Sequence, residues 1–154
     1  MIRSARLFFA SPVLILVALL GLEGARTVCD DLVFTTAATQ LSFWGRESYQ
    51  PTVQTIDLTG QQLESLLQRS PSKPNYLAEQ AYFLSWKGYA SDDVAQRLAY
   101  NKSAASTQLQ ALAQRPAYRQ GWAEMIKYSS RMSGGGEMLE QAQARFVALQ
   151  PAAN

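Results

Sequence analysis

The sequence predicts an all-α protein in which an N-terminal transmembrane helix precedes a short stack of antiparallel helix pairs. Apolar residues recur with helical spacing through most of the chain, and no segment shows sustained alternation with a period of two. Prolines separate the helical segments, because proline lacks a backbone N–H and pushes the preceding residue out of the helical region. The dividing prolines are Pro51, Pro71, Pro74, Pro116 and Pro151.

Composition narrows the class of protein before any motif is considered. The chain has 154 residues, 47% of them hydrophobic, which is enough for one folded domain with a core. Its formal charge is only +2, so the sequence lacks the basic excess that would predict a nucleic-acid partner. There is no histidine and a single cysteine, Cys29. Histidine-dependent zinc sites, Cys-His pairs and Ser-His-Asp triads are therefore excluded.

Residues 1–24 are expected to form a membrane anchor. Arg3 and Arg6 precede the apolar run Leu7–Leu22, whose sixteen residues span about 24 Å as a helix. That length lies between a signal-peptide core and a minimal transmembrane helix, so a removed signal and a buried helix of a soluble domain are the alternatives. The arginines predict a cytoplasmic N-terminus with the rest of the chain exported. Cys29 would then be a juxtamembrane residue or an intermolecular pairing site.

Residues 25–58 are predicted to form a juxtamembrane helix and a loop. The helix Leu32–Tyr49 would begin at an N-cap supplied by Asp30 or Asp31. The segment Thr52–Leu58 is interpreted as a loop that leads to the next cap. The apolar stripe of the helix consists of Ala37, Ala38, Leu41 and Trp44.

Residues 59–151 are predicted to be the helical domain. Thr59 followed by Gln62 resembles a capping box, and Asp92 or Asp93 can cap a later helix. The expected buried side chains of the successive helices are Leu63, Leu66 and Leu67, then Tyr76, Phe83 and Trp86, then Leu98, Ala105, Leu109 and Leu112, then Tyr118, Trp122, Met125 and Met132, and finally Leu139, Ala142, Phe146 and Leu149 between Glu137 and Gln150.

The helix pairs of this domain also resemble one another. Gln68-Arg69-Ser70-Pro71 is matched by Gln114-Arg115-Pro116, and Pro116 and Pro151 are 35 residues apart. A tetratricopeptide repeat has about 34 residues, so we predict a short tetratricopeptide-like stack. Neither pair could bury its aromatic stripe alone, whereas stacking makes a continuous core. The alternative is an irregular helical bundle.

The layout resembles small membrane-anchored proteins of bacterial exopolysaccharide clusters, the VpsP-like polysaccharide biosynthesis family. The resembling segments are the anchor, Phe43-Trp44-Gly45-Arg46, Tyr49-Gln50-Pro51-Thr52, Tyr76-Leu77-Ala78 to Trp86-Lys87-Gly88, Arg115-Pro116-Ala117-Tyr118 and Gly121-Trp122-Ala123-Glu124. The resemblance implies an accessory role in making or exporting surface polysaccharide. It also implies a single-pass protein of the bacterial inner membrane with a periplasmic C-terminal domain.

The polar motifs give little indication of catalysis. The pairs Asp30-Asp31 and Asp92-Asp93 are read as helix caps rather than cation ligands, because adjacent residues do not face each other on a helix. Gly134–Gly136 lacks the Lys and Ser or Thr of a phosphate-binding loop and is read as an interhelical turn. We expect no catalytic residue, cofactor or metal.

The favoured hypothesis is therefore a non-enzymatic protein that docks other envelope or polysaccharide-machinery proteins. The concave surface of the first helices would provide the contacts, with Tyr82, Lys87, Arg119 and Tyr128 as the candidate binding residues. A structural subunit that oligomerises through the anchor or Cys29 is a further alternative.

A carbohydrate-binding or hydrolytic protein is the rival from another class. Glu79 and Glu124 would then be its paired carboxylates, at the 5 to 9.5 Å or so that glycosidases require. Aromatic side chains that could stack on sugar are Tyr76, Tyr82, Trp86, Tyr89 and Trp122, although helical spacing places most of them in the core. The basic residues of the proline turns, namely Arg69, Lys73, Arg115 and Arg119, are expected to form a solvated edge, with an anionic polymer or lipid headgroups as the alternative contact.

Overall fold

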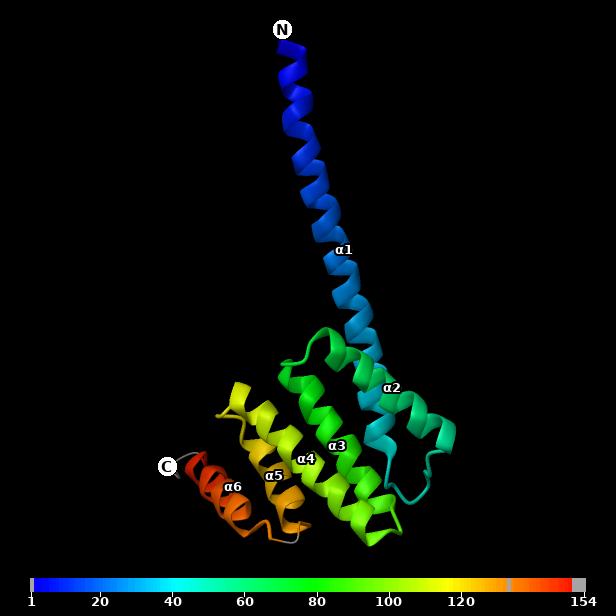
Figure 1. Cartoon of the computed structure of the whole chain (residues 1–154), viewed down its shortest axis with the longest axis vertical. Helices are drawn as coiled ribbons and strands as arrows, with labels where there is room; N and C mark the ends of the chain where they lie inside the picture. The colour runs from blue at the N-terminus through cyan, green and yellow to red at the C-terminus, as the bar shows by residue number, and fades with distance from the viewer. Residues whose placement is uncertain (1, 133, 151–154) are drawn as a thin grey trace.

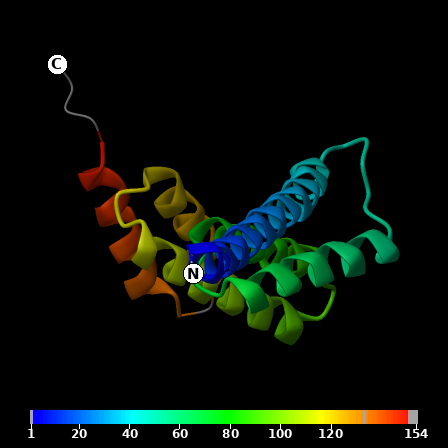
Figure 2. The same ribbon diagram turned by 90° about the horizontal axis from the view of Figure 1, so that it is seen from above.

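The computed structural model, which describes residues 2–132 and 134–150, is all-helical within those ranges (Figures 1 and 2). The all-α prediction is confirmed. The helices are α1 (Ile2–Phe43), α2 (Val53–Arg69), α3 (Pro74–Ala90), α4 (Val94–Gln114), α5 (Arg119–Ser130) and α6 (Gly136–Ala148). From α3 to α6 each helix packs against the next one in the chain, and α2 packs against both α1 and α3.

Helix α1 is much longer than the other helices, and its N-terminal half projects away from the body (Figure 1). Residues 15–29 are exposed, whereas Ala37 and Leu41 are fully buried against the body. In the described part of the chain, no helix combines the length and the apolar character that crossing a membrane requires. The predicted anchor, residues 1–24, includes residues 1–14, whose side chains lie outside the described part.

The prediction that a helix begins at Leu32 with an aspartate cap is wrong. Helix α1 continues without interruption to Phe43, and Asp30 and Asp31 lie in its interior. No proline or glycine occurs between Gly24 and Phe43, so nothing in this segment ends a helix. The helix stops earlier than the expected Tyr49, because Gly45 adopts a left-handed conformation with φ of 80°.

Asp30 and Asp31 instead attach α1 to the connection between α2 and α3. Arg69 Nη2 lies 2.8 Å from Asp30 Oδ1, and Lys73 Nζ lies 3.3 Å from Asp31 Oδ1. The Asp30 side chain is only 16% exposed, so its ion pair is the better shielded of the two. The residues read as caps therefore hold two helices together.

Helix α2 begins before the predicted capping box. Thr52 is its N-cap, and the Thr55 backbone N–H donates to Thr52 Oγ1 at 3.2 Å. Thr59 is buried within the helix and donates its hydroxyl to the Thr55 carbonyl at 2.8 Å. The interpretation of 52–58 as a loop is thus wrong, and the expected domain boundary at residue 58 falls inside α2. Asp93, by contrast, caps α4 as predicted, accepting from the Ala95 N–H at 2.8 Å.

The core has two parts, one where α1, α2 and α3 meet and one among α3, α4, α5 and α6. Buried members of the first are Ala37, Leu41, Trp44, Leu63 and Phe83. Buried members of the second are Ala81, Ala104, Ala105, Leu112, Trp122, Met125, Tyr128 and Ala142. Leu66 and Tyr76 are also fully buried, as the stripes predicted.

The buried face of α4 differs from the predicted one. Ala105 and Leu112 are buried as predicted, whereas Leu98 and Leu109 are each 37% exposed, and Ala104 and Ala111 complete the face that packs inward. Small side chains let the backbones of neighbouring helices approach closely. Tyr118 is likewise exposed at the N-cap of α5, so the stripe of that helix begins at Trp122. In α6 Ala142 is buried, while Phe146 and Leu149 pack against the core from its edge.

Two proline turns lie at one end of the body. The connections from α2 to α3 and from α4 to α5 both lie on the side from which α1 projects (Figure 1). The α5–α6 connection lies at the opposite end and includes Gly134, with φ of 83°, in agreement with an interhelical turn. Pro151, the predicted end of the last repeat, lies outside the described residues.

The close approach of α5 to α4 at Gly121 gives a first testable prediction. A Cβ at position 121 would lie 2.8 Å from Leu112 Cδ2 and 2.9 Å from Tyr118 Cδ1. Overpacking costs about 1–3 kcal/mol, whereas replacing a helical glycine by alanine gains about 1 kcal/mol. We expect Gly121→Ala to lower the free energy of unfolding by about 1 kcal/mol, measured by thermal or denaturant unfolding of the full chain.

Gly136→Ala is the matched control. A Cβ at this position would meet nothing within 4 Å, so only the gain in helix propensity remains. A Gly121→Ala protein as stable as the Gly136→Ala protein would contradict the packing at this contact.

Candidate functional site

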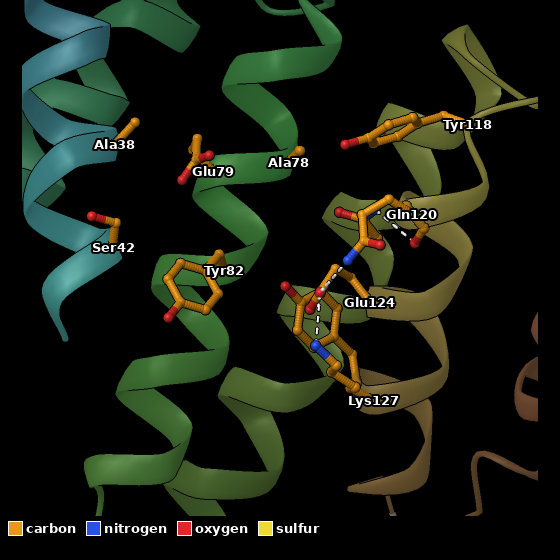
Figure 3. Close-up of a pocket in the computed structure, with 12 residues that line it drawn as sticks. Ala38, Ser42, Ala78, Glu79, Tyr82, Tyr118, Gln120, Glu124 and Lys127 are labelled. Atoms are coloured by element: carbon orange, nitrogen blue, oxygen red, sulfur yellow. Dashed lines mark hydrogen bonds and ion pairs between the residues drawn. The ribbon is translucent and has the colours of Figure 1, made fainter. Parts of the chain in front are cut away.

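A hollow of about 400 Å³ opens between α1, α3 and α5, with α4 at its floor. We call it the central groove, and Figure 3 shows the side chains that line it. These are Ala38 and Ser42 of α1, Ala78, Glu79 and Tyr82 of α3, Gln108 of α4, and Tyr118, Gln120, Gly121, Glu124, Lys127 and Tyr128 of α5. The groove therefore combines two carboxylates, aromatic walls and one ammonium group.

Helical spacing explains why these residues share one groove. Ala78 and Tyr82 are four residues apart on α3, and Gln120, Glu124 and Tyr128 follow the same spacing on α5. Side chains four residues apart lie one above the other on a helix. Two such rows, one on each wall, face one another across α4 (Figure 3).

The two carboxylates have different surroundings. Glu124 Oε1 lies 2.8 Å from Lys127 Nζ and accepts a hydrogen bond of 3.2 Å from Gln120 Nε2. Glu79 makes no ion pair within the described residues. Burial raises the pKa of Glu79, and the negative charge of Glu124 raises it further. Glu79 is thus a half-buried carboxylate that lacks a cation.

Two of the three tyrosines that line the groove, Tyr82 and Tyr128, keep their protons over a wide pH range. Burial raises the pKa of both Tyr82 and Tyr128, and the charge of Glu124 acts in the same direction. Tyr128 is 2% exposed, whereas Tyr82 is only half-buried. Each therefore presents a neutral hydroxyl beside an aromatic face.

Gln108 places an unused acceptor at the floor of the groove. Its Nε2 donates to the Gly121 carbonyl at 3.0 Å, and the side chain is 2% exposed. Its Oε1 is buried and has no hydrogen-bond partner in the described part of the chain. A buried carbonyl oxygen without a partner costs about 1–3 kcal/mol, so this amide is a local cost of packing α4 against α5.

The structure brings together only some of the residues proposed from the sequence. Tyr82 and Tyr128 line the central groove, together with the carboxylate pair Glu79 and Glu124 of the rival hypothesis. Lys87 and Arg119 do not line it.

Helix geometry explains why Lys87 and Arg119 do not line the central groove. Lys87 lies five residues beyond Tyr82, on another face of α3, where its Nζ is 4.8 Å from the ring centre of Tyr100. Arg119, the first residue of α5, stacks 4.1 Å above the Phe146 ring of α6.

Most of the other aromatic residues considered for sugar stacking are structural. Tyr76 is 1% exposed, and Trp86 packs against Trp44 with their ring centres 4.5 Å apart. Trp122 is buried and donates its Nε1–H to the Pro116 carbonyl at 2.8 Å. Tyr89 is exposed but lies outside the central groove.

Sequence reasoning missed Gln108 and Lys127 as groove residues. Gln108 could have been found, because it is a polar residue on the alanine-rich face that Ala104 and Ala111 define. Lys127 carried no such signal, since a single exposed lysine near a helix end is common. Within the described residues no three His, Cys, Asp or Glu side chains are placed to hold a metal ion.

No family model, curated protein or solved structure matches this chain. The geometry of the groove is therefore the basis for assigning a function.

The raised pKa of Glu79 predicts how stability depends on pH. The pKa of Glu79 is higher in the folded chain than in the unfolded chain, so the folded chain binds this proton more tightly. As the pH rises from the lower of these pKa values to the higher one, ionisation of Glu79 lowers the free energy of unfolding. Glu79→Gln removes this cost. We expect the variant to melt at a higher temperature than the parent near neutral pH, with the difference vanishing below about pH 4, where both states are protonated.

Glu140→Gln is the control, because Glu140 is exposed on α6 and lies outside the groove. A Glu79→Gln protein less stable than the parent near neutral pH would show that the carboxylate has a stabilising partner.

Proposed function

We propose that this chain is a non-enzymatic accessory protein of exopolysaccharide biosynthesis or export, which docks a segment of a partner protein in its central groove. The observation that carries the docking role is the half-buried carboxylate of Glu79, which has no cation partner in the described residues and lies in a groove beside Tyr82 and Tyr128. The polysaccharide setting is taken from the sequence resemblance.

The chemistry of the groove favours a partner segment with a basic side chain. A lysine or arginine would supply Glu79 with the counter-charge that it lacks, and its methylene groups would pack on Tyr82. Apolar walls with a few convergent polar groups are typical of specific binding sites.

The helical arrangement supports the same mode of recognition. We interpret α3 with α4 and α5 with α6 as two tetratricopeptide-like pairs, whose first helices form the walls of the groove. Stacked helix pairs of this kind bind extended or helical segments on their concave surface. We further propose that residues 1–24 anchor the chain in the bacterial inner membrane in a single pass, with the helical body in the periplasm.

Carbohydrate binding is the second candidate, and the same carboxylate favours it. Sugar hydroxyls can donate to Glu79, and sugar C–H groups can stack on Tyr82. Hydrolysis is less well supported, because Glu124 is already held by Lys127 and Gln120. Peptide docking is preferred, because a cation neutralises Glu79 whereas a hydroxyl only solvates it.

Site-specific photocrosslinking in the native membrane tests this function. A photoreactive residue at Ser42, which lines the groove, should form an adduct with an envelope protein, and one at Ser106, exposed on α4 outside it, should not. Glu79→Gln should lower the Ser42 adduct by about tenfold or more, because removing one charge of a buried pair is costly. Glu140→Gln should leave it unchanged.

Mass spectrometry of the adduct then decides the ligand class. The crosslinked peptide should contain a lysine or arginine near the attachment point. A Ser42 adduct that is insensitive to Glu79→Gln, or a contact peptide without a basic residue, would overturn the docking proposal. Loss of the adduct when soluble exopolysaccharide fragments are added would assign the groove to carbohydrate instead.

A further inference from the structure

A second surface lies at the end of the body from which α1 projects. We define the cationic end as the basic side chains Arg26, Arg69, Lys73, Arg115, Arg119 and Arg145, which come from α1 and from the chain segments around both proline turns and the end of α6. Figure 1 shows the two turns and the last turn of α6 on this side of the molecule.

Contacts between elements connect these residues into one row. Asp30 and Asp31 of α1 pair with Arg69 and Lys73 of the first proline turn. Arg115 of the second turn donates its Nη2–H to Asn75 Oδ1, next to the start of α3. The surface is therefore continuous across the fold.

The row continues along the second proline turn to α6. Arg115 lies 5.3 Å from the ring centre of Tyr118, and the following Arg119 stacks on Phe146 at 4.1 Å. Arg145 is the neighbour of Phe146 in α6 and is exposed. The cationic end thus spans the body from α1 to its last helix.

Charge at this end is unbalanced. The carboxylates nearby are Glu23, Asp30 and Asp31, and the two aspartates already pair with Arg69 and Lys73. Arg115 and Arg119 make no ion pair within the described residues and contact aromatic faces instead. A net positive surface therefore remains beside the emerging helix.

We propose that the cationic end docks on an anionic lipid surface and so orients the helical body against the membrane. The proposal rests on the anchor of the proposed function. If the anchor ends near Gly24, the six residues to Asp30 place Arg69 about 9 Å from the lipid surface. That distance is close to the Debye length of about 8–10 Å at physiological salt, so the lipid charge still attracts Arg69.

The test uses the full chain in nanodiscs of phosphatidylcholine alone or mixed with phosphatidylglycerol. With Cys29→Ser as background, Ala117→Cys in the second proline turn carries an environment-sensitive fluorophore, and Asp92→Cys at the opposite end carries the control label. We expect a blue shift and a loss of iodide quenching at position 117 in anionic discs only. Neither change should occur at position 92, and added salt should reverse both at 117.

Charge reversal separates lipid docking from unspecific effects. Each lost cation should weaken attraction to an anionic surface about fivefold, so Arg115→Glu with Arg119→Glu should abolish the signal at position 117. Lys102→Glu, exposed on α4 between the two ends, should leave it intact. If the double variant does not fold, Arg145→Glu alone should still weaken it, because this exposed side chain has no ion pair in the described residues.

Each remaining outcome bears on one proposal. Equal protection of position 117 in neutral and anionic discs, or its persistence in the folded charge variants, would overturn lipid docking. A response of the label to a soluble anionic polysaccharide in neutral discs would assign the cationic end to that polymer. The last outcome is a chain that dissociates from neutral discs but binds anionic ones through Arg115 and Arg119. It would contradict the proposed membrane anchor and support the proposed lipid-docking surface.

Discussion

The close contact between α4 and α5 at Gly121 is the constraint on which the central groove depends. A glycine at this position lets the two backbones approach, and the Gln108 side chain then reaches the Gly121 carbonyl at 3.0 Å. The same approach buries Trp122 and Met125 against the alanine face of α4. Because α3 also packs against α4, the spacing of the groove walls is set by Gly121 of α5 and by the alanine face of α4.

The attachment of α1 depends on a different kind of contact. Near Asp30 it is electrostatic and aromatic, with Lys73 donating to the Tyr76 hydroxyl at 2.8 Å while Tyr76 packs on Phe34 at 5.1 Å between ring centres. Hydrogen bonding to Tyr76 raises the pKa of Lys73, which keeps its charge available to Asp31. Further along, Trp44 fits against Phe83 and Trp86. A long helix that contacts the body at both points is held in direction as well as in position.

The sequence was a good guide to the helices and a poorer one to what their polar residues do. Proline and the 3.6-residue period located α3 to α6, because both act through local backbone geometry. Asp30 was read as a cap because a capping aspartate and an ion-paired aspartate look alike in one dimension. Which one is present depends on Arg69, a partner 39 residues away that only the folded chain brings near.

Side-chain placement around the groove was predictable to the same limited extent. Tyr82 and Tyr128 were placed on a shared surface because both lie on first helices of their pairs. Lys87 and Arg119 lie on those same helices but face Tyr100 and Phe146, since a shift of one residue turns a side chain by about 100° around the helix. The order of the helix pairs along the chain therefore predicted which helices form the groove walls. The rotation of each helix about its axis, which the sequence did not reveal, determines which side chains line the groove.

The groove and the cationic end meet at Tyr118, and this bears on how the two proposals fit together. Its side chain lines the groove, and Arg115 lies over its ring at 5.3 Å. A fold under selection for stability alone would gain by replacing Glu79 with a neutral residue, because burial and the charge of Glu124 disfavour its ionised form. This cost lies in the groove, which is where recognition would repay it. A partner seated in the groove would contact Tyr118 and so lie beside Arg115 of the cationic end.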